Sequence, residues 1–277
     1  DEKQDKYGYL AVLHMDGDGI GKLRFDSADS HSEFSSILAQ FSEEVGDTIK
    51  NYGGILVYSG GDDVLALLPL KSALPCAYEI QSKFTDKLQS VGKITMSAGI
   101  AITPHNFPLD LALNMARQAE EHAKNRYRIS EGDKKGAVAI TEAHGTGTIR
   151  ESGATWNVIE LIDKLIGYFA DDTLSGKLGY DMLEIAYYMG GDVPPEAREA
   201  ELGRIIKRRL AENVGDAIKK EILEGNPQKN QASLAKRIAE FAEQKDEHDN
   251  LRWQDMAHWV ILARFIAKPI PEGVKQP

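Results

Sequence analysis

Two adjacent carboxylates, Asp62 and Asp63, follow a pair of glycines between two short apolar runs, residues 55–57 and 64–68. The length and composition of these runs are typical of β-strands, so the residues between them are predicted to form a hairpin turn. Gly60 and Gly61 supply the positive-φ conformations that such a turn requires. The tip then presents two carboxylates that can bind a metal ion. A tight turn without chemistry is the alternative interpretation.

A third carboxylate, Asp16, ends the apolar run 9–15, which is predicted to be a buried central strand. Mg²⁺ takes oxygen ligands from one or two carboxylates, and substrate phosphates complete its coordination. Two such ions activate a hydroxyl and stabilise a leaving pyrophosphate. We therefore predict that Asp16, Asp62 and Asp63 are catalytic and hold the metal, as in a polymerase palm. Asp18 is either a further acid of this site or a solvated loop residue.

Two lysines are candidates for phosphate binding. Lys22 closes the glycine-rich loop 17–21, where the absence of side chains at positions such as Gly19 lets backbone N–H groups approach a phosphate. The loop is not a Walker A motif, because Leu23 follows the lysine where that motif needs Ser or Thr. Lys124 ends a predicted helix near the same site. The alternatives are a plain strand–helix turn for Lys22 and a solvated helix end for Lys124.

The elements that position these residues follow the order β-α-β-β-α-β-α-β. The strands are expected near 9–15, 55–57, 64–68, 94–102 and 136–140, and the helices near 34–49, 72–88 (capped by Ser72) and 108–126. This order predicts an α+β, ferredoxin-like palm with a mainly antiparallel sheet and its helices on one face. The hairpin would lie beside the first strand and bring Asp16 near the two hairpin acids. We assign residues 1–145 to the palm.

The remainder, residues 146–277, is predicted to be an all-helical domain. Its helices are expected near 156–171, 175–189, 195–213, 215–224, 231–245 and 251–267. One of them carries a basic cluster, predicted to be a solvated face or else a contact with RNA or another subunit: Arg204, Lys207, Arg208 and Arg209. Trp253 and Trp259 are expected to pack in the core.

Composition narrows the classes of protein. A net charge of −10 over 277 residues argues against a protein that coats nucleic acid by bulk electrostatics. The single cysteine, Cys76, excludes an internal disulfide and a cysteine zinc cluster, and it is expected to be buried. No run of 18 apolar residues or signal peptide is present, which predicts a cytoplasmic protein without a membrane partner. The start at Asp1, without Met, suggests a piece of a longer polypeptide.

Asp16, the Gly60-Gly61-Asp62-Asp63 turn and Ala123-Lys124 together resemble the palms of class III nucleotidyl cyclases and GGDEF diguanylate cyclases. The resemblance is more specific to the large polymerase-like (cyclase) subunit of type III CRISPR effector complexes, in the type III-B (Cmr) form. That family converts ATP to cyclic oligoadenylates when target RNA binds. The likeness implies Mg²⁺ or Mn²⁺ on the three aspartates and a nucleotide site formed by Ser59 (beside the adenine), Gly60, Gly61, Lys22, Lys124 and Gly19.

The resemblance also implies partners: other subunits of the effector complex, guide RNA, target RNA and a second palm that faces this one. The family's nuclease domain, first palm and zinc module do not appear in this sequence, so the chain is expected to supply half of a catalytic site. A GTP-using diguanylate cyclase is an alternative, although Asp63-Val64 stands where that family has Glu-Phe. A catalytically idle structural or nucleotide-binding subunit is the other alternative.

Overall fold

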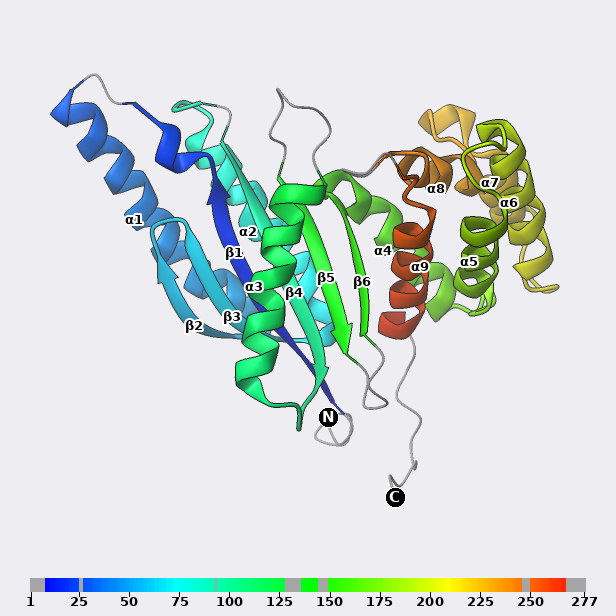
Figure 1. Ribbon diagram of the computed structural model, residues 1–277, viewed down its shortest axis with the longest axis horizontal. Helices are drawn as coiled ribbons and strands as arrows, with labels where there is room; N and C mark the ends of the chain where they lie inside the picture. The colour runs from blue at the N-terminus through cyan, green and yellow to red at the C-terminus, as the bar shows by residue number, and fades with distance from the viewer. Residues whose placement is uncertain are drawn as a thin grey trace. The chain divides into compact units, whose positions relative to one another are not determined.

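The computed structural model of the chain describes residues 8–24, 27–92, 94–127, 136–143, 149–245 and 250–267 (Figure 1). It divides into two compact units, Asp1–Ile159 and Glu160–Pro277. The first unit is a sheet with helices on its faces, and the second is helical. This confirms the predicted α+β palm followed by an all-helical region.

In the first unit a six-stranded sheet has the order β2-β3-β1-β4-β5-β6. All neighbouring strands are antiparallel except β4 and β5, which are parallel. The hairpin strands lie beside β1, as predicted. The elements are β1 Tyr9–Asp18, η1 Ile20–Lys22, α1 Ala28–Asn51, β2 Ile55–Gly60, β3 Asp63–Pro69, α2 Leu70–Leu88, β4 Thr95–Pro104, α3 Leu109–Arg126, β5 Ala137–Ala143, β6 Ile149–Thr155 and η2 Trp156–Val158.

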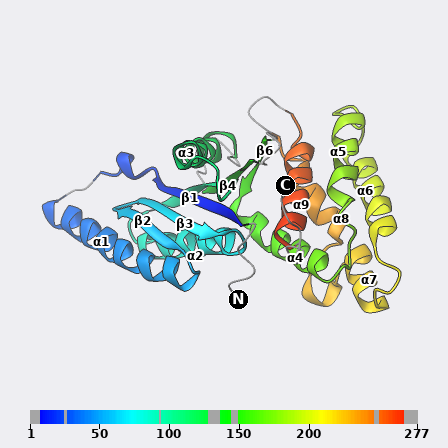
Figure 2. The same ribbon diagram turned by 90° about the horizontal axis from the view of Figure 1, so that it is seen from below.

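Helices cover both faces of this sheet, not one face as the sequence predicted. Figure 2 shows α1 and α2 on one side of the strands and α3 on the other. Ala112 and Ala116 of α3 pack on Val12 of β1 and Ala101 of β4. The expectation was wrong because helical periodicity identifies the apolar stripe of a helix but not the face of the sheet that the stripe covers.

A sixth strand, which the sequence analysis did not predict, extends the sheet. β6 pairs with β5 from Ala137↔Thr155 to Ala143↔Ile149. Trp156 follows it and donates from Nε1 to the Met96 carbonyl at 2.8 Å. The first unit therefore runs to Ile159, beyond the expected boundary at 145/146. The sequence Gly-Thr-Gly-Thr at residues 145–148 also suggests a loop, but this segment lies outside the described residues.

The helical unit contains the six expected helices: α4 Ile159–Ala170, α5 Leu178–Tyr188, α6 Pro195–Arg209, α7 Asp216–Glu224, α8 Leu234–Ala242 and α9 Trp253–Ala267, with a short η3 at Pro227–Lys229. Trp253 and Trp259 of α9 are buried, as predicted. In the first unit Cys76 is buried as well, whereas Ser72 does not cap α2, which begins at Leu70. Within the described residues no helix is long and apolar enough to cross a membrane.

Candidate active site

Asp16 and Asp63 lie at the same end of two neighbouring strands. The antiparallel register of β1 and β3 pairs Met15 with Val64, and the next residue on each strand is one of these acids. Side chains alternate between the faces of a strand. Asp16 therefore shares a face with Val12, and Asp63 shares it with Leu65, and both of those apolar residues pack toward α3. The two carboxylates thus face the same side of the sheet.

Asp62 occupies the opposite side. A Cβ on Gly17 would lie 2.9 Å from Asp62 Cβ and 3.0 Å from Cζ of Phe84 on α2. The Asp62 side chain therefore begins on the α1 and α2 side. Burial raises the pKa of Asp62, the charge of Asp63 raises it further, and its own backbone N–H opposes both effects.

The three predicted metal ligands therefore do not meet on one face. Across the described residues, no group of three or more His, Cys, Asp and Glu side chains is arranged to hold a metal ion. Asp16 and Asp63 together offer the one or two carboxylates that Mg²⁺ uses when phosphates complete its coordination.

The hairpin tip shows why its sequence is glycine-rich. Gly61 has φ of 65°, in the left-handed region, and its carbonyl accepts a hydrogen bond from Ser42 Oγ at 3.4 Å. Gly60 ends β2 opposite Asp63. Just before it, the Ser59 hydroxyl is buried and has no hydrogen-bond partner in the described part of the chain. Ser59 pairs with Val64, so its side chain starts on the side of the sheet opposite Asp16 and Asp63, and its expected place beside the adenine stays a prediction.

Lys124 is a member of the site and not a solvated helix end. Its ammonium forms ion pairs with Asp16 Oδ2 and, at 2.8 Å, with Glu120 Oε1. The lysine side chain is only 26% exposed, and desolvation lowers its pKa to about 8. The last turn of α3 thus places one cation directly against a predicted metal ligand.

Glu120, which the sequence analysis missed, is the second anchor of that lysine. Its side chain is 12% exposed. Burial raises the pKa of Glu120 to about 7, and the charges of Asp18 and Asp63 add to the increase. His14 Nδ1 lies 3.9 Å from Glu120 Oε2, and burial lowers the pKa of this histidine. The sequence feature that could have identified Glu120 is its i,i+4 spacing from Lys124, which favours an ion pair on a helix.

Gly99 on β4 lets α3 come this close to the sheet. A Cβ at this position would overlap the Ala116 carbonyl oxygen and the Glu120 backbone nitrogen, and would lie 2.8 Å from Glu120 Cα. Because the glycine has no side chain, the helix backbone rests directly on the strand. The contact fixes the height at which Glu120 and Lys124 stand above β1.

Asp18 is held by the sheet and is not a solvated loop residue. Thr95 Oγ1 donates to Asp18 Oδ2 at 2.8 Å, and Ser97 Oγ lies 2.9 Å from both carboxylate oxygens. Ser97 is also the register partner of Asp16. Hydroxyl donors of this kind stabilise an ionised carboxylate. Asp18 therefore adds a fixed negative charge beside the site.

The structure describes the backbone of the glycine-rich loop, residues 17–21, and of Lys22 after it. Gly19 is left-handed, with φ of 83°, and precedes the three residues of η1. Lys22 ends η1, and its side chain lies outside the described part. Its predicted phosphate contact remains a prediction.

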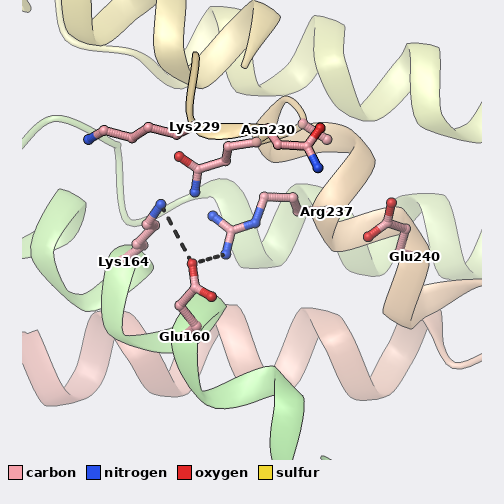
Figure 3. A pocket seen from close by; sticks show the side chains of 8 residues that line it. Glu160, Lys164, Lys229, Asn230, Arg237 and Glu240 are labelled. Carbon is pink, nitrogen blue, oxygen red and sulfur yellow. Dashed lines mark hydrogen bonds and ion pairs between the residues drawn. The ribbon is translucent and has the colours of Figure 1, made fainter. Parts of the chain in front are cut away.

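The helical unit has a polar hollow of about 450 Å³ (Figure 3). Within it Glu160 lies between Arg237, at 3.3 Å, and Lys164, at 3.8 Å, so these two cations are already paired. None of the sequence-predicted site residues lines this hollow. The lining residues are Glu160, Lys164, Lys229, Asn230, Gln231, Ala232, Arg237 and Glu240.

Two of the four residues of the basic cluster on α6 are neutralised by acids. Arg204 pairs with Glu201, and Arg209 forms a bidentate pair with Asp181. Lys207 and Arg208 are exposed. The solvated-face interpretation fits this arrangement.

The strand order, the acids at the ends of β1 and the neighbouring hairpin, and the lysine above them define a palm domain of the polymerase and cyclase class. Residues 9–131 match the family model described as Cas10/Cmr2, second palm domain, so this segment is a palm of that family. The resemblance stated from the sequence is thereby confirmed.

Relatives support the same assignment. The CRISPR system Cmr subunit Cmr2 of Pyrococcus furiosus is 30% identical over 184 residues, which cover 55% of this chain and 20% of that protein. A type III-B Cmr-beta structure in the apo state shares the fold with a TM-score of 0.64 at 13% identity, covering 95% of this chain and 39% of that one. A Csm1–Csm4 cassette in complex with cA4 matches with a TM-score of 0.53 at 15% identity, covering 95% and 38%. The chain thus spans about a fifth of the curated relative.

Proposed function

We propose that this palm joins ATP molecules into cyclic oligoadenylates, with divalent metal ions, within a type III CRISPR effector complex. The observation that carries the proposal is the placement of Asp16 and Asp63 on adjacent strand ends of one sheet face, in a Cas10/Cmr2-type palm. The related cassette that binds cA4 supports the product class. A second palm, other subunits, guide RNA and target RNA belong to the same proposal, because the chain spans only part of its relatives.

The residues present fit a divalent cation. Asp16 and Asp63 offer the hard oxygen ligands that Mg²⁺ and Mn²⁺ prefer. Asp16 Oδ2 already contacts a cation, the Lys124 ammonium, which stands in for a metal at that oxygen. When bound, the metal would make the 3′-hydroxyl a better nucleophile and neutralise charge on the phosphates.

The reaction forms a bond between O3′ of one nucleotide and the α-phosphorus of another, while the bond from that phosphorus to the pyrophosphate oxygen breaks. Pyrophosphate leaves, and the proton of the 3′-hydroxyl passes to solvent. Asp16 and Asp63 orient the reacting groups on one face of the sheet. Lys124 carries a positive charge that can pair with a phosphate oxygen.

The test is incubation of the reconstituted complex with ATP, Mg²⁺ and target RNA, with products identified by mass spectrometry. We expect Asp16→Asn and Asp63→Asn to lower oligoadenylate formation at least about a hundredfold, because each removes a metal ligand. Asp47→Asn, at an exposed position of α1, is the matched control and should leave product unchanged. Full product from both site variants contradicts the proposal. A parallel reaction with GTP separates it from a diguanylate cyclase.

A second candidate is a palm that binds nucleotide without turning it over. The observation that favours it is the Lys124 ion pair on Asp16, together with the absence of a three-ligand group in the described residues. In the same reaction this candidate predicts bound ATP, an assembled complex and no product from the unaltered chain.

A further inference from the structure

The ion pair between Lys124 and Asp16 occupies the position where the proposed function needs a metal. The ammonium contacts Oδ2 of Asp16, an oxygen that Mg²⁺ or Mn²⁺ would also use. A divalent metal ion and the Lys124 ammonium would repel each other strongly if both were bound to the same carboxylate oxygen. Both side chains are mostly shielded, with 26% of Lys124 and 28% of Asp16 exposed, so solvent screens this competition only in part.

Glu120 offers the lysine a second anchor one helical turn away. Glu120 Oε1 lies 2.8 Å from the same ammonium, and its side chain is 12% exposed. The lysine stem has four flexible methylene groups, so the ammonium can leave Asp16 while it keeps its contact with Glu120. Gly99 holds this turn of α3 against β4, which keeps both anchors in place.

We propose that Lys124 is an internal counter-cation: it occupies Asp16 until a divalent cation displaces it, and the displaced ammonium then pairs with the nucleotide phosphates. The inference rests on the proposed function and assigns Lys124 two successive partners. Metal binding alone must break the Lys124–Asp16 pair. Phosphates offer the displaced ammonium a new partner, so metal and nucleotide bind with positive coupling.

The experiment measures Mn²⁺ affinity of the full 277-residue chain without nucleotide, by calorimetric titration. Lys124→Met should tighten Mn²⁺ binding about tenfold, because it frees Asp16 and leaves Glu120 uncompensated. Arg117→Met is the matched control: it removes the same charge from an exposed position of the same helix and should change the affinity no more than about twofold. Circular dichroism checks that each variant is folded. If Lys124→Met does not fold, Glu120→Gln combined with Lys124→Met removes the unpaired buried acid and should also tighten Mn²⁺ binding.

The second readout is ATP binding at saturating Mn²⁺, the condition in which the proposal places the Lys124 ammonium on the phosphates. Lys124→Met should weaken it several-fold, since the phosphates lose a cation, whereas Arg117→Met should not. Opposite effects of Lys124→Met on the two ligands support the inference. Unchanged or weaker Mn²⁺ binding by folded Lys124 variants overturns it.

Asp16→Asn separates failure of this inference from failure of the proposed function. If Asp16→Asn abolishes Mn²⁺ binding and Lys124→Met does not tighten it, the counter-cation role is wrong and the metal site stands. If Asp16→Asn and Asp63→Asn both leave Mn²⁺ affinity unchanged, the metal site itself is wrong, and the counter-cation role falls with it.

Discussion

Asp62 and Asp63 are neighbours in sequence but face opposite sides of the sheet. Asp63 shares its face with Asp16 and α3, whereas Asp62 stands against Gly17 and Phe84 on the α2 side. We expect Asp63→Asn to abolish product, and Asp62→Asn to lower the rate about tenfold or less, because Asp62 acts from a distance. The measurement is the initial rate of ATP consumption by each single variant in the complex. Equal and complete loss in both variants would show that the two acids act together.

Single residues also mark where prediction from sequence reached its limit. The hairpin acids and Asp16 were found because strand ends and glycine turns have a clear pattern. Glu120 was missed because a glutamate on a helix is usually solvated, and its burial depends on how closely α3 approaches β4. That approach depends on Gly99, which sequence alone does not distinguish from any other glycine in a strand.

At the scale of secondary structure elements, the contact between α3 and β4 sets the geometry of the site. Gly99→Ala would force a methyl group into the helix backbone at Ala116 and Glu120, so α3 must shift. We expect a loss of stability of about 2 kcal/mol and weaker ATP binding in the presence of Mn²⁺. Urea unfolding and a nucleotide titration measure the two effects.

The matched control for that change is Gly46→Ala in α1. A Cβ there would meet only Leu56 Cδ2, at 3.5 Å, an ordinary contact. Alanine is the better helix former, so this variant should keep or gain up to about 1 kcal/mol. A Gly99→Ala protein as stable as Gly46→Ala would show that α3 is not held by backbone contact.

One residue of the β5–β6 pair, Glu142, makes a pH-dependent contribution to the stability of the fold. Glu142 lies opposite Arg150 in the register, is 4% exposed, and has its pKa raised by burial from 4.5 to about 7. A raised carboxyl pKa means that the protonated form favours folding. This stability is complete below about pH 4.5 and is lost as the pH rises through about 7, amounting to roughly 3 kcal/mol.

Glu142→Gln removes this titration. The unfolding free energy of the wild type, relative to that of the variant, should therefore fall between pH 5 and pH 8. Denaturant unfolding of both proteins across this range measures the difference and cancels the titration of other groups. A difference that stays constant with pH would contradict the assignment.

Strands and helices with strong apolar patterns were predictable, and β6 was not. The sequence of β6, IRESGAT, has little apolar character, yet Ser152 and Thr155 are buried. Its place depends on pairing with β5 and on the Trp156 anchor, which are non-local. The same dependence explains why the unit ends at Ile159 and not at the expected boundary.

At the scale of the whole molecule, each unit has buried interactions of its own. In the helical unit Arg198, 2% exposed, forms a bidentate pair with Glu243 at 2.6 Å and donates to the carbonyl of Gly190 at 2.7 Å. Trp253 Nε1 donates to the same glutamate at 2.9 Å. One buried cation thus joins α6, α9, the loop before α6 and the end of α8.

Arg198→Met should destabilise the helical unit by about 3 kcal/mol, because it removes the cation paired with Glu243 and the donor to the Gly190 carbonyl. Arg204→Met, which removes an exposed arginine from the same helix, should cause no measurable change. Hydrogen exchange read by mass spectrometry resolves the two units. Loss of protection confined to the palm, with the helical unit unaffected, would contradict this account.

The close contact between Gly17 and Asp62 restricts the order in which these two positions can change. Any larger residue at position 17 would enter the space of Asp62 Cβ, Ile20 and Phe84. Gly17→Ala is therefore expected to be tolerated only after position 62 has lost its side chain, so the two substitutions are epistatic. In a library that randomises both positions and is selected for folded protein, larger residues at position 17 should be recovered together with glycine at position 62. Selected sequences that keep Asp62 should keep Gly17.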